Sequence, residues 1–179
     1  MSDCLVIGGG VIGMMSARAL VVSGANVTLL DKSECGGESS WAGGGIISPL
    51  YPWHYDDLTN ELSFASQVVY EDLCNELYES SGINPQYIKS GLLMLDEYDS
   101  ETAVNWMDRF NVSYKKQGNG ALFTNIAQVR NPRLLQALKV DIVRKGVKVV
   151  ENTQVQSISL SGDRAMGVKT NKGEFIANN

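Results

Sequence analysis

The chain has 179 residues, of which 44% are hydrophobic and 20% charged. This length suits one domain of ordinary size or one domain with a small insert, and the composition predicts a packed core rather than disorder. Lys and Arg number 15 against 20 Asp and Glu, a net charge of −5. That balance argues against a nucleic-acid partner, because a phosphate backbone requires clustered cations.

No apolar run approaches the roughly 20 residues that span a bilayer. No basic segment precedes a hydrophobic stretch at the N-terminus, so we expect no signal peptide. Cys4, Cys35 and Cys74 are widely spaced and form no CxxC pair, which fits a reducing cytoplasm. With a single histidine, His54, the sequence predicts no metal site.

The first 31 residues predict a β-α-β unit. An apolar strand over 4–8 ends in glycines, apolar residues at helical spacing predict a helix over 11–23, and a second apolar strand covers 27–30. Gly24 stands where a helix ends in a left-handed residue. A length of about 30 residues is that of a parallel crossover unit.

The remaining chain alternates helices with strands. Helices are predicted over 58–81, 100–110 and 131–145, and strands over 91–95, 147–150, 155–160, 165–170 and 174–177. The first of these helices is expected to bury Leu62, Ala65, Val69, Leu73 and Leu77. The segment 114–120 is expected to be a loop and 121–129 to be extended. Asn131 is expected to cap the last helix, with Pro132 in its first turn.

The sequence GGGVIG at 8–13 matches the pattern G-x-G-x-x-G in the context of a dinucleotide site. It follows a strand and opens a helix, and the next strand ends in Asp31. Gly8 permits the tight turn, Gly10 lets a pyrophosphate approach the backbone, and Gly13 lets the helix pack closely. The helix N-terminus attracts phosphates, and Asp31 would accept hydrogen bonds from ribose hydroxyls. The alternative is a glycine-rich turn in an ordinary α/β protein.

The segment after Asp31 favours FAD over NAD. In many NAD enzymes the second strand leads into another crossover helix, whereas here it leads to GGESSWAGGGII at 36–47. Small residues let a backbone lie close to a flat or phosphorylated ligand, and Ser39 and Ser40 offer hydroxyl groups. A flexible glycine loop is the alternative.

These segments resemble the FAD-dependent oxidoreductases of the D-amino-acid oxidase superfamily, and within it the glycine oxidases of thiamine biosynthesis. The matching stretches are CLVIGGGVIGMMSARAL, VTLLD, ESSWAGGGIISPLYPW, VRNPRLLQAL and GVKVVENTQV. The resemblance implies an α/β fold. A GR2-type, Rossmann-like FAD-binding domain would cover 1–84 and 127–179, with an incomplete α+β substrate domain inserted at 85–126.

The resemblance also implies how FAD would be held. Backbone N–H groups of Val11 and Ile12 would bind the pyrophosphate, and the Val155 backbone would pair with the adenine. Asp31 and Lys32 would lie at the adenosine ribose. The full expected cofactor-binding set is Gly8, Gly10, Val11, Ile12, Gly13, Asp31, Lys32, Ser39, Ser40, Gly43, Gly44, Gly45, Ile46 and Val155.

The implied reaction oxidises glycine or a similar small D-amino acid or secondary amine. A hydride passes from the substrate α-carbon to flavin N5, with the ring along 44–46, and O₂ reoxidises the flavin. One alternative is a dehydrogenase of the same family that uses a quinone or another acceptor. Another is an FAD-binding fragment without turnover. Homo-oligomerisation stays open.

The resemblance implies a longer polypeptide. A carboxylate-binding arginine, a substrate-facing tyrosine and a second FAD segment are expected beyond Asn179, so no catalytic residue is assigned. Four arginines of this sequence are expected to be solvated at the surface: Arg109, Arg130, Arg133 and Arg144. Four aromatic residues either line a substrate entrance or form a packing cluster: Tyr51, Trp53, His54 and Tyr55.

Overall fold

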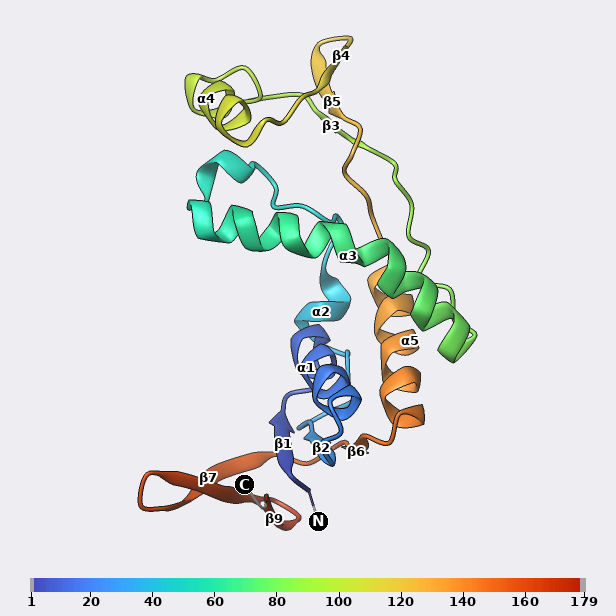
Figure 1. Cartoon of the computed structure of the whole chain (residues 1–179), viewed down its shortest axis with the longest axis vertical. Helices are drawn as coiled ribbons and strands as arrows, with labels where there is room; N and C mark the ends of the chain where they lie inside the picture. Colours follow the sequence, from blue (N-terminus) through green and yellow to red (C-terminus); the bar gives the residue numbers. More distant parts are fainter. Residues whose placement is uncertain (1, 178–179) are drawn as a thin grey trace. The chain divides into compact units, whose positions relative to one another are not determined.

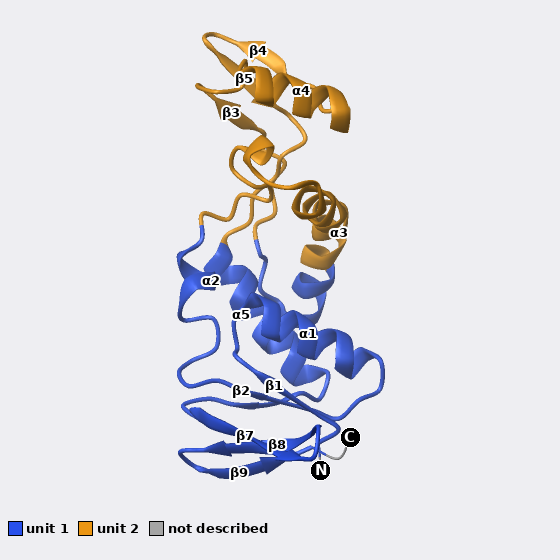
Figure 2. Cartoon of the chain, turned by 90° about the vertical axis from the view of Figure 1, so that its left-hand side faces the viewer, with its two compact units in different colours: residues 1–43, 76–85, 131–179 blue, residues 44–75, 86–130 orange. Residues whose placement is uncertain are grey.

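The computed structural model describes residues 2–177, and the chain divides into two compact units (Figure 2). Unit 1 is formed by 1–43, 76–85 and 131–179, and unit 2 by 44–75 and 86–130. Each unit therefore joins segments that are distant in the sequence. Residues 44–75 belong to the same compact unit as 86–130.

Unit 1 contains a parallel sheet of three strands in the order β1-β2-β6 (Figure 1). The strands are β1 (Cys4–Ile7), β2 (Val27–Leu30) and β6 (Lys148–Val150). The central strand β2 is buried at every position, as is typical of parallel sheets. Helix α1 (Val11–Val22) connects β1 to β2, which confirms the predicted β-α-β start and the Rossmann-like α/β class.

The core of unit 1 lies where α1, β2 and α5 (Asn131–Arg144) pack together. Met14 from α1, Leu29 from β2, and Leu138 and Ile142 from α5 have no exposed surface. Full burial of each such side chain stabilises the fold by about 1.5–3 kcal/mol. This core therefore fixes the position of the first turn of α1 beside the ends of β1 and β2.

A second sheet in unit 1 is antiparallel and has the order β7-β8-β9. Its strands are β7 (Val155–Ser161), β8 (Arg164–Thr170) and β9 (Gly173–Ile176). The hydroxyl of Thr170 accepts a hydrogen bond from the Lys172 N–H at 3.0 Å and donates to the Gly173 carbonyl at 2.8 Å, which closes the β8-β9 turn. The structure therefore confirms the strands predicted in this region.

Unit 2 has an antiparallel sheet in the order β3-β5-β4. Its strands are β3 (Leu92–Met94), β4 (Lys115–Gln117) and β5 (Gly120–Phe123). The core combines Trp53 of the short helix η1 (Pro52–His54) with Trp106 of α4 (Glu101–Phe110), their ring centroids 6.1 Å apart. The Ser100 hydroxyl caps α4 by accepting the Ala103 N–H.

Three short elements were not predicted: η1, β4 and the helix α2 (Ser39–Ala42). The expected loop over 114–120 contains β4, a strand whose three residues Lys-Lys-Gln are all exposed. It is an edge strand, and because neither face is buried it carries no alternating hydrophobic pattern. Helix α2 lies within the expected glycine loop and is only four residues long.

Helix α3 (Asp57–Ser81) forms as predicted, but its expected buried stripe is largely exposed. Leu62 is 71% exposed and Val69 55% exposed, whereas Leu77 is fully buried. The apolar spacing marks one face of a helix, but burial also needs a partner for that face. Within the described residues, the predicted stripe is covered only near Leu77, whereas the N-terminal part of α3 packs through a different residue, Phe64, against the unit 2 core.

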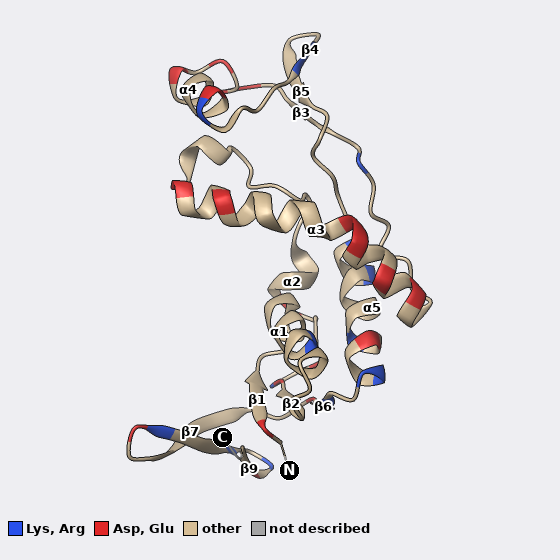
Figure 3. Ribbon diagram, in the orientation of Figure 1, with Lys and Arg blue, Asp and Glu red and all other residues tan. Residues whose placement is uncertain are grey.

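Helix α3 contains six acidic residues and no Lys or Arg (Figure 3). Three of them pair with cations from other elements: Asp57 with Arg109 at 2.7 Å, Glu71 with Lys89 at 2.5 Å, and Glu76 with Arg18 at 2.6 Å. The acidic surface of α3 is thus partly neutralised by the chain itself. No helix in the described part of the chain combines the length and the apolarity that a membrane span requires.

Candidate functional site

A cleft of about 360 Å³ lies in unit 1, at the carboxyl ends of β1 and β2. Ligands of open α/β sheets bind at this edge of the strands, and the volume is in the range of small-molecule sites. The lining residues are Ile7, Gly8, Gly10, Leu30, Asp31, Lys32, Glu34, Gly36, Gly37, Glu38, Ser39, Ser40, Thr153, Gln154 and Val155.

The glycine loop that borders the cleft requires its glycines. Gly8 has a φ of +100°, a conformation that other residues rarely adopt, and its N–H donates to the Leu30 carbonyl at 2.8 Å. A Cβ at Gly13 would lie 1.8 Å from the Gly8 carbonyl oxygen, so the first turn of α1 packs directly on the loop. Gly10 caps α1 and lines the cleft.

Asp31 ties the end of β2 to this loop. Its Oδ2 accepts the Gly9 N–H at 2.5 Å, and its Oδ1 accepts the Ser33 N–H at 2.7 Å. Oδ1 also accepts the Ser33 hydroxyl at 3.1 Å, whereas Oδ2 keeps a further acceptor position that is compatible with a ribose hydroxyl as an additional donor. The sequence predicted Asp31 as a ribose ligand and did not predict its bond to the loop.

The start of α2 reaches the same loop from the other side. The Ser40 Oγ accepts the Val11 N–H at 3.0 Å. A Cβ at Gly10 would lie 3.1 Å from that hydroxyl, so Ser40 stands directly over the loop. Two residues earlier, Glu38 forms an ion pair with Lys32 at 3.0 Å.

The residues present fit the ADP part of a dinucleotide. The cleft offers a glycine cradle and the positive end of α1 for a pyrophosphate, and Asp31 for a ribose. The backbone of 153–155 borders the cleft as well, and the Thr153 N–H donates to the Asp31 carbonyl at 2.7 Å.

Half of the expected cofactor-binding residues line this cleft: Gly8, Gly10, Asp31, Lys32, Ser39, Ser40 and Val155. Val11, Ile12 and Gly13 form the first turn of α1, beside it. The cleft is also lined by residues that were not predicted from the sequence: Glu34, Glu38, Thr153 and Gln154. Their only sequence signal is adjacency to Asp31, Ser39 and Val155.

The expected residues 43–46 do not line the cleft. The Gly43 carbonyl accepts a hydrogen bond from Asn131 Nδ2 at 2.9 Å. Asn131 is itself the first residue of α5, whereas the sequence placed it one position before the helix. In unit 2, the Gly45 carbonyl accepts the Val129 N–H at 2.8 Å, and Ile46 forms a β-bridge with Gln128.

Cys35 lies beneath the glycine loop. A Cβ at Gly9 would lie 2.3 Å from the Cys35 Sγ, and the Cys35 N–H donates to Glu151 Oε1 at 2.6 Å. Burial raises the pKa of the Cys35 thiol to about 12, and the nearby carboxylates of Glu151 and Asp31 add to this rise. Cys35 is therefore a packing residue that stays in its neutral form.

Cys35 is expected to react slowly with iodoacetamide, because the thiolate is the reactive form. At about pH 8 its labelling should be more than about tenfold slower in the native chain than in the same chain unfolded in denaturant. Peptide mass spectrometry after timed quenching measures both rates. Equal rates in the two states would contradict the packed, neutral thiol.

The aromatic segment after the cleft separates into two kinds of residue. Trp53 is 5% exposed and belongs to the unit 2 core, so packing explains it. Tyr51 donates its hydroxyl to Asp96 at 2.8 Å, and the His54 ring lies 2.7 Å from a Glu97 carboxylate oxygen. In the described part of the chain, no group of three His, Cys, Asp or Glu side chains is placed to hold a metal ion.

Three of the four arginines expected to be solvated contact the chain itself. Arg109 pairs with Asp57 and lies over the Phe110 ring at 4.9 Å. Arg133 donates to the Asn84 carbonyl at 2.6 Å, and Arg144 donates to the Ser80 carbonyl. The side chains of these arginines thus hold elements together.

Comparison with known proteins assigns the family. Residues 3–178 match the family model DAO, described as FAD dependent oxidoreductase. The chain belongs to this family. The predicted family is therefore confirmed, and its cofactor is FAD.

Two of the most similar relatives are glycine oxidases. That of Pseudomonas aeruginosa is 37% identical over an alignment of 188 residues, which covers 96% of this chain and 52% of the relative. That of Pseudomonas putida is 36% identical, covering 97% of this chain and 52% of the relative. The chain thus spans about half the length of the curated relatives it matches.

A solved structure shares the fold. The glycine oxidase of Bacillus cereus superposes with a TM-score of 0.86 at 24% identity, covering 99% of this chain and 53% of that one. At this identity the match supports the fold alone, in agreement with the parallel β1-β2-β6 sheet.

Proposed function

We propose that the cleft of unit 1 holds the ADP half of FAD, and that the chain takes part in the oxidation of glycine or a similar small D-amino acid or secondary amine. The observation that carries this proposal is the glycine loop and Asp31 at the carboxyl ends of β1 and β2, in a member of an FAD-dependent family. The glycine oxidases among its relatives support the substrate class.

In this proposal each part of the cleft has one task. The N–H groups of Val11 and Ile12 at the positive end of α1 bind the pyrophosphate, and Gly8 and Gly10 leave room for it. Asp31 accepts hydrogen bonds from the ribose. The other cleft groups have the roles expected from the sequence: Lys32 near the ribose, Ser39 and Ser40 near the pyrophosphate, and the Val155 backbone at the adenine.

The flavin ring of the cofactor is assigned to 44–46. Small residues there let a planar ring approach the backbone. FAD, when bound, supplies the hydride acceptor for the reaction, and the chain binds and orients it.

We also propose that 1–84 and 127–179 form the FAD-binding part and 85–126 part of a substrate domain. A cytoplasmic location completes the proposal, since Cys4, Cys35 and Cys74 are free thiols.

The test is to purify the protein, add FAD, remove the excess, and measure retained flavin absorbance and peroxide formation with glycine in air. Retained flavin with peroxide supports an oxidase. Retained flavin with reduction of an added quinone, but no peroxide, supports a dehydrogenase of the same family. Retained flavin without either product supports a cofactor-binding segment without turnover. A colourless protein that retains no flavin contradicts the proposal.

A further inference from the structure

The cleft has one cationic side chain, and a carboxylate already holds it. Among the described residues that line the cleft, Asp31, Glu34 and Glu38 are acidic and Lys32 is the single cation. Lys32 Nζ lies 3.0 Å from Glu38 Oε1, and both side chains are 60% exposed. The hydrogen bond from Lys32 to Glu38 raises the lysine pKa, so Lys32 remains charged. A bound pyrophosphate would therefore meet three carboxylates and a lysine that is already paired.

The same segment also engages the glycine loop. Ser40 accepts the Val11 N–H at 3.0 Å, and this N–H is one of the two assigned to the pyrophosphate. Glu38 and Ser40 thus engage two groups that an anionic ligand needs, the Lys32 ammonium and the Val11 N–H. Both belong to the start of α2, within three consecutive residues.

We propose that residues 38–40 are a latch that holds the phosphate-binding groups of the cleft until a cofactor replaces it. This inference rests on the proposed ADP site. When ADP enters, Lys32 at the adenosine ribose exchanges Glu38 for an oxygen of the phosphate attached to that ribose, and Ser40 gives up the Val11 N–H. Glu38 thereby sets the affinity for the cofactor, since each bound phosphate competes with it for the same lysine.

The latch is tested by calorimetric titration of the chain with ADP and, in parallel, with adenosine, which has no phosphates. Glu38→Gln should strengthen ADP binding about two- to fivefold at low salt, the effect expected of an exposed ion pair, with the gain shrinking as salt rises. Adenosine binding should not change. The matched control is Glu34→Gln, which removes a cleft carboxylate that forms no ion pair with the described residues, and its gain should be smaller.

Combining Glu38→Gln with Lys32→Met distinguishes the latch from simple repulsion between Glu38 and the phosphates of ADP. In a Lys32→Met background, the gain from Glu38→Gln should fall to that of Glu34→Gln, because no lysine remains to be released. An equal gain with and without Lys32 would overturn the latch while ADP binding itself continues to support the proposed function. If the wild-type chain binds neither ADP nor adenosine, the proposed function fails, and the latch fails with it.

The Ser40 contact has a test that needs no ligand. In the ligand-free chain, Ser40→Ala should speed hydrogen exchange at the Val11 amide, whereas Ser39→Ala on the same short helix should not. Adding ADP to the Ser40→Ala variant should restore slow exchange, because the phosphate replaces the hydroxyl. Unchanged Val11 exchange in the free Ser40→Ala variant would overturn this half of the latch.

Discussion

Replacing Gly13 with alanine is expected to destabilise the chain by about 3–5 kcal/mol and to abolish ADP binding. Helix propensity alone predicts the opposite sign, a gain of about 1 kcal/mol, because alanine favours a helix over glycine. The clash decides the outcome: the new Cβ would lie 1.8 Å from the Gly8 carbonyl oxygen, and that atom belongs to the rigid loop. Either α1 moves off the loop or the cleft loses its shape.

Urea denaturation followed by circular dichroism measures the change. The control is Gly44→Ala, because no heavy atom lies within 4 Å of the Cβ position at Gly44. Its effect on the free energy of unfolding should stay within about 0.5 kcal/mol. A Gly13→Ala variant as stable as Gly44→Ala would show that α1 does not pack on the loop as described.

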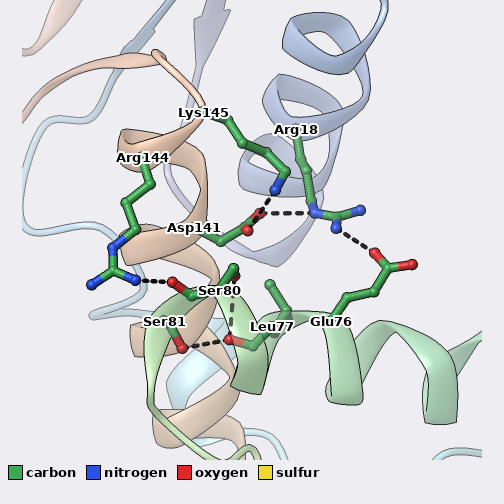
Figure 4. Close-up of polar contacts among 8 residues, drawn as sticks. All are labelled: Arg18, Glu76, Leu77, Ser80, Ser81, Asp141, Arg144 and Lys145. Carbon is green, nitrogen blue, oxygen red and sulfur yellow. Dashed lines mark hydrogen bonds and ion pairs between the residues drawn. The ribbon is translucent and has the colours of Figure 1, made fainter.

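Replacing Asp141 with alanine is expected to cost about 3–5 kcal/mol of stability. The Asp141 side chain is 1% exposed and joins α5 to α1 by an ion pair to Arg18 at 2.9 Å (Figure 4). It also pairs with Lys145, four residues along the chain, at 2.8 Å. The variant leaves Arg18, itself only 17% exposed, with one carboxylate partner, Glu76. Arg18 then loses its buried partner and keeps only an exposed one, which accounts for most of the loss.

The control is Glu76→Gln, which removes the exposed partner of the same arginine. Glu76 is 59% exposed, so its pair should contribute less than about 1 kcal/mol. Thermal unfolding of both variants separates the buried contact from the exposed one. Equal losses of stability in Asp141→Ala and Glu76→Gln would mean that Asp141 is solvated rather than buried.

The contribution of Asp141 to the free energy of unfolding should also depend on pH. Burial raises the pKa of this carboxyl, but hydrogen bonds from Lys145, Ser80 and Arg18 outweigh burial, so its pKa lies below the ordinary 3.8. A lowered folded-state pKa gives stability that is present above about pH 4 and is lost as the pH falls through the folded value. The stability difference between wild type and Asp141→Ala should therefore shrink on acidification.

The sequence predicted those features that depend on local pattern. The glycines at 8–13 and the apolar runs of β1 and β2 lie within about 30 residues, and their spacing alone predicts a β-α-β unit. Features that depend on distant partners were not predictable in this way. The bond from Asp31 to Gly9 and that from Ser40 to Val11 arise only when the loop and α2 fold over the same cleft.

The burial of side chains on α3 shows the same limit of prediction from local sequence pattern. Leu62 and Leu77 belong to the same predicted apolar stripe, yet Leu62 is 71% exposed and Leu77 is fully buried. Periodicity shows which face of a helix is apolar, whereas the packing partner decides which part of that face is covered. β4 shows the converse, because a polar edge strand has no hydrophobic pattern to detect.

Binding of the ADP half of FAD in the cleft of unit 1 can be measured by titrating isotope-labelled chain with ADP and recording amide chemical shifts. We expect saturable shifts at Gly8, Gly10, Asp31 and Val155, with the Trp106 amide of unit 2 unchanged. Shifts confined to unit 2, or no saturable shift at the glycine loop, would contradict binding in this cleft.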